Sequence, residues 1–165
     1  GAVIHWELLA PGLKYNMSEV QAAMGIHQLP KLDAFIEARR RHAERYQRAL
    51  DAVAEIETFF PRANGVLHAH HLFIIALRNG GVRIDRDGLM EGLKAENIGT
   101  GVHFRSLHLQ PYYRETFGYL PEDFPHALDL SNRILSLPLY PTMTNQDVEG
   151  VIKAITKLVG FYREA

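Results

Sequence analysis

A cation and an amide lie close together near the start of the chain. Residues 12–25 read GLKYNMSEVQAAMG, so Lys14 and Asn16 come just before a segment of small residues that favours a helix. An ammonium group, an amide and the free N–H groups of a helix N-terminus can converge on a phosphate. A Schiff-base lysine instead needs a lowered pKa, through burial or a neighbouring cation. The position of Lys14 suits an anion contact, and a solvated loop lysine agrees with it equally well.

Three histidines form a second group of candidate residues. His68, His70 and His71 lie within four positions, and imidazole is a common metal ligand. In a strand, however, only His68 and His70 would share a face, and no third ligand follows at a standard spacing. We therefore expect no metal site, and we expect His71 to be buried or to face a site at the start of a strand.

A third group surrounds the sequence VHFRSLHL. A histidine at the end of a short strand, followed by an arginine and a loop, can bind an anionic ligand or move a proton. His103, Arg105 and His108 are therefore candidate ligand-binding residues, and a structural role for the histidines remains equally compatible with the spacing. The sequence contains no dinucleotide-binding, phosphate-loop, zinc-protease or nucleophile-elbow motif.

The composition limits the classes of function. The chain has 165 residues, 47% of them apolar and 22% charged, which is typical of a folded domain. A formal net charge of -1 gives no reason to expect a nucleic-acid partner. No apolar run approaches the roughly 18 residues of a membrane span, and the first residues do not resemble a signal peptide. We expect a soluble, cytoplasmic protein that begins inside a longer chain, and the absence of cysteine excludes disulfides.

The pattern of apolar residues predicts the elements that must position these groups. Helices are expected after the capping residues Ser18, Asp85 and Thr144, the first of which forms a capping box with Gln21. Gly99 is expected to be the left-handed residue that ends the second of these helices. The other expected elements are a helix at 31–53, strands at 56–60, 71–77 and 101–104, a helical turn at 111–113 and a helix at 124–134. This order predicts an α+β domain with a small, mostly antiparallel sheet covered by helices.

Four segments in fixed order carry a family resemblance. They are GLKYNMSEVQAAMGIHQLPKLDAFIEARRRHAERY, HLFIIAL, NIGTGVHFRSLHLQPYYRE and LSNRILSLPLYPTMTNQDVEGVI. Together they resemble the C-terminal half of the DegT/DnrJ/EryC1/StrS family, the pyridoxal 5'-phosphate (PLP) sugar aminotransferases of the aspartate aminotransferase fold type. The resemblance covers essentially the whole chain, and four collinear motifs are far more specific than any one of them.

The resemblance implies a fold and a domain organisation. Residues 1–30 would continue from a missing N-terminal PLP domain, and residues 31–165 would form the C-terminal small domain of a fold-type I PLP transferase, preceded by a long helix. The complete protein would be more than twice this length and a homodimer with shared active sites. The Schiff-base lysine would lie in the missing part, so no catalytic residue is expected here. The five lysines of the chain, none in the family's Schiff-base segment, are Lys14, Lys31, Lys94, Lys153 and Lys157.

The resemblance also implies roles for single residues. Many members have Asn-Tyr-Arg where this chain has Lys14-Tyr15-Asn16, and in them the Asn reaches the PLP phosphate of the neighbouring subunit. Lys14 and Asn16 would therefore bind the cofactor of a partner, although the exchange leaves open which of them touches the phosphate. His103 matches the histidine of the family's Val-His-Tyr/Phe motif near the sugar-nucleotide site. Arg105 and His108 are weaker candidates for the same site.

The implied reaction is a transamination with PLP as cofactor. Glutamate would give its amino group, leaving 2-oxoglutarate, and a keto-sugar nucleotide would receive it. The segments APGLKYN and IDRDGLMEGLKAENIGTGVHF resemble the branch that aminates a UDP-4-keto-pentose for lipid A modification. Members with histidine in place of the Schiff-base lysine are sugar dehydratases, which is one alternative. A non-catalytic dimerisation or folding fragment is another, and an unrelated metal-binding module is a remote third.

Overall fold

The computed structural model describes residues 15–59 and 65–163. They belong to two compact units, of which the first ends at Asp33 and the second begins at Ala34. Lys14 lies outside the described residues, as does residue 60 of the expected strand 56–60.

The first unit contains helix α1 (Glu19–Gln28) and the short 3-10 helix η1 (Leu29–Lys31). Its N-terminus has the capping box that the sequence predicts. The Ser18 hydroxyl accepts a hydrogen bond from the Gln21 amide at 3.3 Å, and the Gln21 side chain accepts one from the Ser18 amide at 2.9 Å. No residue of α1 is buried, although the helix carries Met24 and Ile26.

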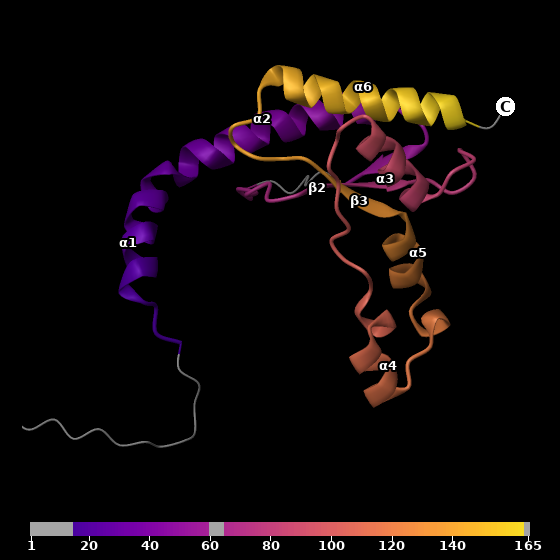
Figure 1. The fold of residues 1–165 in the computed structure, drawn as a ribbon, viewed down its shortest axis with the longest axis horizontal. Helices are drawn as coiled ribbons and strands as arrows, with labels where there is room; N and C mark the ends of the chain where they lie inside the picture. The colour runs from indigo at the N-terminus through magenta and orange to yellow at the C-terminus, as the bar shows by residue number, and fades with distance from the viewer. Residues whose placement is uncertain (1–14, 60–64, 164–165) are drawn as a thin grey trace, which may run out of the picture. The chain divides into compact units, whose positions relative to one another are not determined.

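The second unit contains the sheet and most of the helices (Figure 1). Helix α2 begins at Leu32, within the last residues of the first unit. None of the described helices is long and apolar enough to cross a membrane. The elements are α2 (Leu32–Leu50), β1 (Ile56–Thr58), β2 (Phe73–Leu77), α3 (Arg86–Ala95), η2 (Leu107–Leu109), α4 (Pro111–Phe117), η3 (Pro121–Asp123), α5 (Pro125–Arg133), β3 (Ile134–Leu137) and α6 (Asn145–Tyr162).

The sheet is small and antiparallel, as expected. Its strand order is β1-β2-β3, and Ile75 in the middle strand lies opposite Thr58 and Leu135. Helices α2 and α6 are neighbours, since Arg45 of α2 lies 3.9 Å from Glu149 of α6 (Figure 1). Tyr46 of α2 is fully buried, and its hydroxyl donates a hydrogen bond to the Pro138 carbonyl at 3.0 Å. The apolar core comes from the sheet and helices α2, α3 and α6 together.

Two local expectations are wrong, and one strand was not expected. The strand expected at 101–104 is only a bridge between Gly101 and Ser136, because no other residue of that segment pairs with β3. The helix expected at 124–134 is confirmed as α5, but the strand β3 that follows it was not expected, because a short buried apolar run can fit either period. The left-handed residue after α3 is Asn97, with φ of 62°, rather than Gly99, since the side chain of asparagine tolerates this conformation.

Candidate functional site

His103 is held from one side of its ring. Its Nδ1 lies 2.9 Å from the Ser136 hydroxyl of β3, and the ring edge packs against Phe104. Nε2 has no hydrogen-bond partner among the described residues, and the side chain is only partly buried. One ring nitrogen is therefore engaged by the protein, and the other is available to a ligand.

Arg105 lines a cavity of about 430 Å³ together with a second arginine. The guanidinium of Arg86 is fixed on this wall, because its Nη1 donates to the carbonyls of Ser131 at 3.3 Å and Ile134 at 3.1 Å. Arg105 is exposed and makes no hydrogen bond or ion pair within residues 15–59 and 65–163. Arg86 also pairs through Nε with the Asp87 carboxylate, so Arg105 is the cation on this cavity that remains for an anionic ligand. The full lining is Arg86, Val102, Arg105, Leu109, Ser131 and Asn132.

His108 is placed differently from the other two candidates. It is buried, its Nε2 lies 3.2 Å from the Pro121 carbonyl, and its ring packs against Phe124 at a centroid distance of 5.0 Å. These contacts join η2 to η3 within one segment. The position suits a structural histidine better than a substrate ligand, because the ring is already enclosed by the protein.

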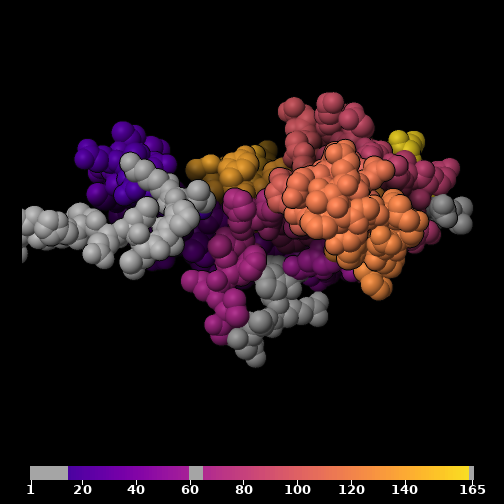
Figure 2. Space-filling view, turned by 90° about the horizontal axis from the view of Figure 1, so that it is seen from below, coloured from indigo at the N-terminus to yellow at the C-terminus, as the bar shows by residue number. Residues whose placement is uncertain are grey.

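An aromatic surface covers the segment that follows. Figure 2 shows residues from η2 to α5, salmon to orange, on the face turned to the viewer. Tyr112 and Phe117 are 65% and 54% exposed, and Phe117 stacks on Tyr119 at 5.5 Å. The sequence Pro-Tyr-Tyr predicted a helical turn here. The spacing of apolar residues did not predict an exposed aromatic surface.

The two candidate cofactor residues belong to the first unit. Asn16 is exposed just before α1, and its side chain makes no hydrogen bond within residues 15–59 and 65–163. Lys14 lies outside the described residues. The structure thus brings Arg105 and Arg86 together on one cavity, and it describes Asn16 only within its own unit.

The three histidines lie in the irregular segment before β2. The backbone of His70 has a positive φ of 45°, which breaks the alternation of a strand. His70 is therefore the buried residue, and His71 is exposed, so His71 is not buried as one of the two expectations had it. The other, that His71 faces a site, stays a prediction, and His71 does line a cavity with His68. Burial and the neighbouring His68 lower the pKa of His70. Within the described ranges, no three His, Cys, Asp or Glu side chains lie close enough to share a metal ion.

Comparison with known proteins identifies the family. The profile of the DegT/DnrJ/EryC1/StrS aminotransferase family matches residues 3–156. The spore coat polysaccharide biosynthesis protein SpsC of Bacillus subtilis (strain 168) is 42% identical over 156 residues, which is 94% of this chain and 40% of SpsC. The chain therefore spans about two fifths of the length of the curated relatives that it matches.

Solved structures agree with the sequence comparison. A DegT DnrJ EryC1 StrS aminotransferase from Brucella abortus is 30% identical with a TM-score of 0.76, over 95% of this chain and 40% of that protein. Spr1654 from Streptococcus pneumoniae in its PLP form has the same fold, with 21% identity and a TM-score of 0.83, over 94% of this chain and 39% of that protein. This chain belongs to the DegT/DnrJ/EryC1/StrS aminotransferase family.

Proposed function

We propose that this chain is the C-terminal part of a PLP-dependent aminotransferase that moves an amino group from glutamate to a keto-sugar nucleotide. The match of the family profile to residues 3–156 carries the proposal. SpsC acts in polysaccharide biosynthesis by its name, which supports a polysaccharide precursor as the substrate class. Spr1654, which shares the fold, has been solved in its PLP form and in its pyridoxamine phosphate (PMP) form.

The described residues alone do not provide a complete PLP site. A Schiff-base lysine must be removed from water or lie beside a cation. The four described lysines are instead exposed, and the ammonium groups of Lys94 and Lys157 lie 3.6 Å from Glu91 and 2.7 Å from Glu96. PLP would supply the electron sink in the complete enzyme, with the Schiff-base lysine contributed by the part outside this sequence.

The first unit would then contribute to the phosphate of the cofactor. Asn16 is exposed, and its side-chain amide makes no hydrogen bond to another described residue, just before a ten-residue helix. The Ser18 hydroxyl is already used by the capping box, so Asn16 and the first N–H groups of α1 are the donors at this end. We assign Lys14 and Asn16 to the PLP phosphate of a partner subunit in a homodimer.

The second unit would contribute to the sugar nucleotide. His103 offers Nε2, and Arg105 offers a guanidinium that no described residue engages. A nucleotide sugar carries hydroxyl groups and a diphosphate, which match these two donors. Losing one hydrogen bond to a charged group costs roughly ten- to a hundredfold in binding. His103→Ala in the full-length enzyme should lower kcat/KM for the nucleotide sugar by about that factor and leave the glutamate half-reaction nearly unchanged.

The apolar side chains of α1 support the assignment of a missing domain. Val20, Met24 and Ile26 are 71%, 62% and 70% exposed, which is unusual for a stable surface helix. We propose that residues 1–30 continue from the N-terminal PLP domain, which covers these side chains, and that residues 31–165 are the small domain.

The reaction is tested on the full-length protein. Glutamate alone should convert bound PLP to the PMP form with one equivalent of 2-oxoglutarate per subunit, and a keto-sugar nucleotide should reverse the spectral change. A panel that includes a UDP-4-keto-pentose would identify the sugar. A protein that removes water from the sugar without consuming glutamate would be the dehydratase, and the proposal would fail.

We also propose that the 165-residue chain alone is inactive, and a separate experiment tests this. The 165-residue chain is mixed with PLP, reduced with borohydride and digested, and each lysine is examined by mass spectrometry. We expect only weak, scattered labelling of exposed lysines, as in a Lys14→Ala control. Stoichiometric labelling of Lys14 that the control abolishes would make Lys14 the Schiff-base residue and overturn its assignment.

A further inference from the structure

A single hydroxyl group interrupts the apolar strand β3. The strand reads Ile-Leu-Ser-Leu, and Ser136 is 4% exposed between Leu135 and Leu137, which are 0% and 4% exposed. A buried hydroxyl without a partner is costly, so its contact explains its presence. The hydroxyl lies 2.9 Å from Nδ1 of His103, 33 positions away in the sequence.

Gly101 brings the histidine to this hydroxyl. Its amide donates to the Ser136 carbonyl at 3.2 Å, and its carbonyl accepts from the Ser136 amide at 2.7 Å. A Cβ atom on Gly101 would lie 2.8 Å from Cε1 of His103, closer than such contacts occur. The imidazole therefore lies directly over the glycine, and lack of a side chain at this position makes the room.

Together these contacts fix which face of the ring can meet a ligand. Nδ1 is bonded to Ser136, so only Nε2 remains, and it has no hydrogen-bond partner among the described residues. A hydroxyl can donate to Nδ1 or accept from it, so the contact fixes the orientation of the ring in either tautomer. Removal of the hydroxyl would release this orientation.

We propose that Ser136 is a positioning residue of the sugar-nucleotide site, which acts by holding His103 over Gly101 with Nε2 presented to a polar group of the substrate. This inference rests on the proposed function for the identity of the substrate. The contact between Ser136 and His103 stands on the structure alone, so the two can be tested separately.

The contact is tested first in the 165-residue chain. The ¹⁵N signals of the His103 ring report the protonation of each nitrogen, and Ser136→Ala should change them. Ser106→Ala is the matched control, because its hydroxyl donates to the Ala127 carbonyl in the same segment without touching His103. Unchanged nitrogen signals in a folded Ser136→Ala chain would refute the contact.

The consequence for the reaction is tested in the full-length enzyme. Ser136→Ala should lower kcat/KM for the keto-sugar nucleotide by roughly two- to tenfold, the effect of one neutral hydrogen bond. The glutamate half-reaction should keep its rate, and Ser136→Thr, which retains the hydroxyl, should recover most of the loss. In a His103→Ala background the effect of Ser136→Ala should vanish, because Ser136 acts through the imidazole.

Several results would overturn the inference. Equal losses in both half-reactions would make Ser136 a purely structural residue, and a loss that persists without His103 would mean that it acts by another route. If Ser136→Ala does not fold, Gly101→Ala provides the second variant, since it displaces the ring from the other side and should show the same confined loss. An unaltered enzyme that does not react with glutamate would refute the proposed function, and with it the substrate assigned here, while the nitrogen signals would still decide the contact.

Discussion

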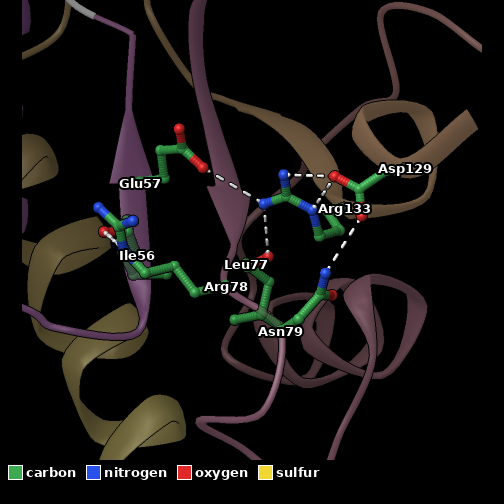
Figure 3. Close-up of polar contacts among 7 residues, drawn as sticks. All are labelled: Ile56, Glu57, Leu77, Arg78, Asn79, Asp129 and Arg133. Carbon is green, nitrogen blue, oxygen red and sulfur yellow. Dashed lines mark hydrogen bonds and ion pairs between the residues drawn. The ribbon is translucent and has the colours of Figure 1, made fainter. Parts of the chain in front are cut away.

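Arg133 is the side chain whose replacement tests the energetics of this domain most directly. Figure 3 shows its guanidinium between three elements. Nε and Nη2 donate to one oxygen of Asp129 at 2.9 and 2.7 Å, and Nη1 donates to Glu57 at 3.3 Å and to the Leu77 carbonyl at 3.2 Å. Asn79 donates to the other oxygen of Asp129 at 3.1 Å. One side chain thereby joins β1, the end of β2 and α5.

The cost of Arg133→Met follows from the exposure of its partners. Methionine keeps most of the apolar stem, so the change removes mainly the charge and the donors. The Leu77 carbonyl loses a donor, which costs about 1–3 kcal/mol where water does not replace it. Asp129 and Glu57 are 45% and 35% exposed, so water screens their pairs with Arg133 and they add at most about 1 kcal/mol. We expect a loss of about 2–3 kcal/mol in the free energy of unfolding.

Urea unfolding of the 165-residue chain measures this loss. For a slope of about 2 kcal/mol per molar urea, the midpoint should fall by roughly 1 M. Arg40→Met is the matched control, because Arg40 also contacts two carboxylates, Glu37 and Glu44, but only along the exposed surface of α2. Its midpoint should change less. An equal or larger effect at Arg40 would refute the argument that the carbonyl and the three joined elements decide the cost.

Three further predictions concern the stability of the same domain. Burial lowers the pKa of His42 below its usual 6.5, so the unfolded chain binds protons better than the folded one. The free energy of unfolding should therefore fall as the pH drops below about 6.5. His42→Gln should reduce this dependence on pH in urea titrations at several pH values. Thr144→Ala removes the hydroxyl that accepts from the Asp147 amide at 3.1 Å, and it should cost about 1 kcal/mol in thermal unfolding. Leu135→Ala, at a fully buried position of β3, should cost about 2–5 kcal/mol, whereas Leu130→Ala on exposed α5 should cost much less in the same assay.

The helix starts could be predicted from the sequence because their causes are local. Ser18, Asp85 and Thr144 each accept a hydrogen bond from the backbone amide three positions later, so one short segment contains both partners. The same reasoning did not find β3 or the single bridge at Gly101. Their partners are other strands and a residue 35 positions away, and short apolar runs do not reveal such pairing.

The residues of the candidate site also differ in whether the sequence alone could predict them. The spacing made His103 a candidate but left a structural role equally open, and the family motif favoured a ligand role, which stays a prediction. The sequence analysis did not name Arg86 or Ser136, because each forms its hydrogen bond with a residue far away in the sequence. One signal was present in the sequence: Ser136 is a lone hydroxyl in the apolar run Ile-Leu-Ser-Leu, and a buried polar residue in such a run requires a partner.

The polar side chains of the described part of the chain fall into two groups, those that bond to other groups of the protein and those that keep a polar group unbonded. Arg133, Arg86 and His108 spend their donors or ring nitrogens on carbonyls and carboxylates of the same unit, and their loss should change stability. Within that part of the chain, His103 retains a ring nitrogen and Arg105 an entire guanidinium without such contacts. His103 is held by Ser136 with one ring nitrogen unused, whereas the Arg105 guanidinium is exposed and bonded to no described residue. Replacing Arg105 should therefore leave the unfolding midpoint nearly constant, while replacing His103 should also lower it, because the buried Ser136 hydroxyl would lose its partner.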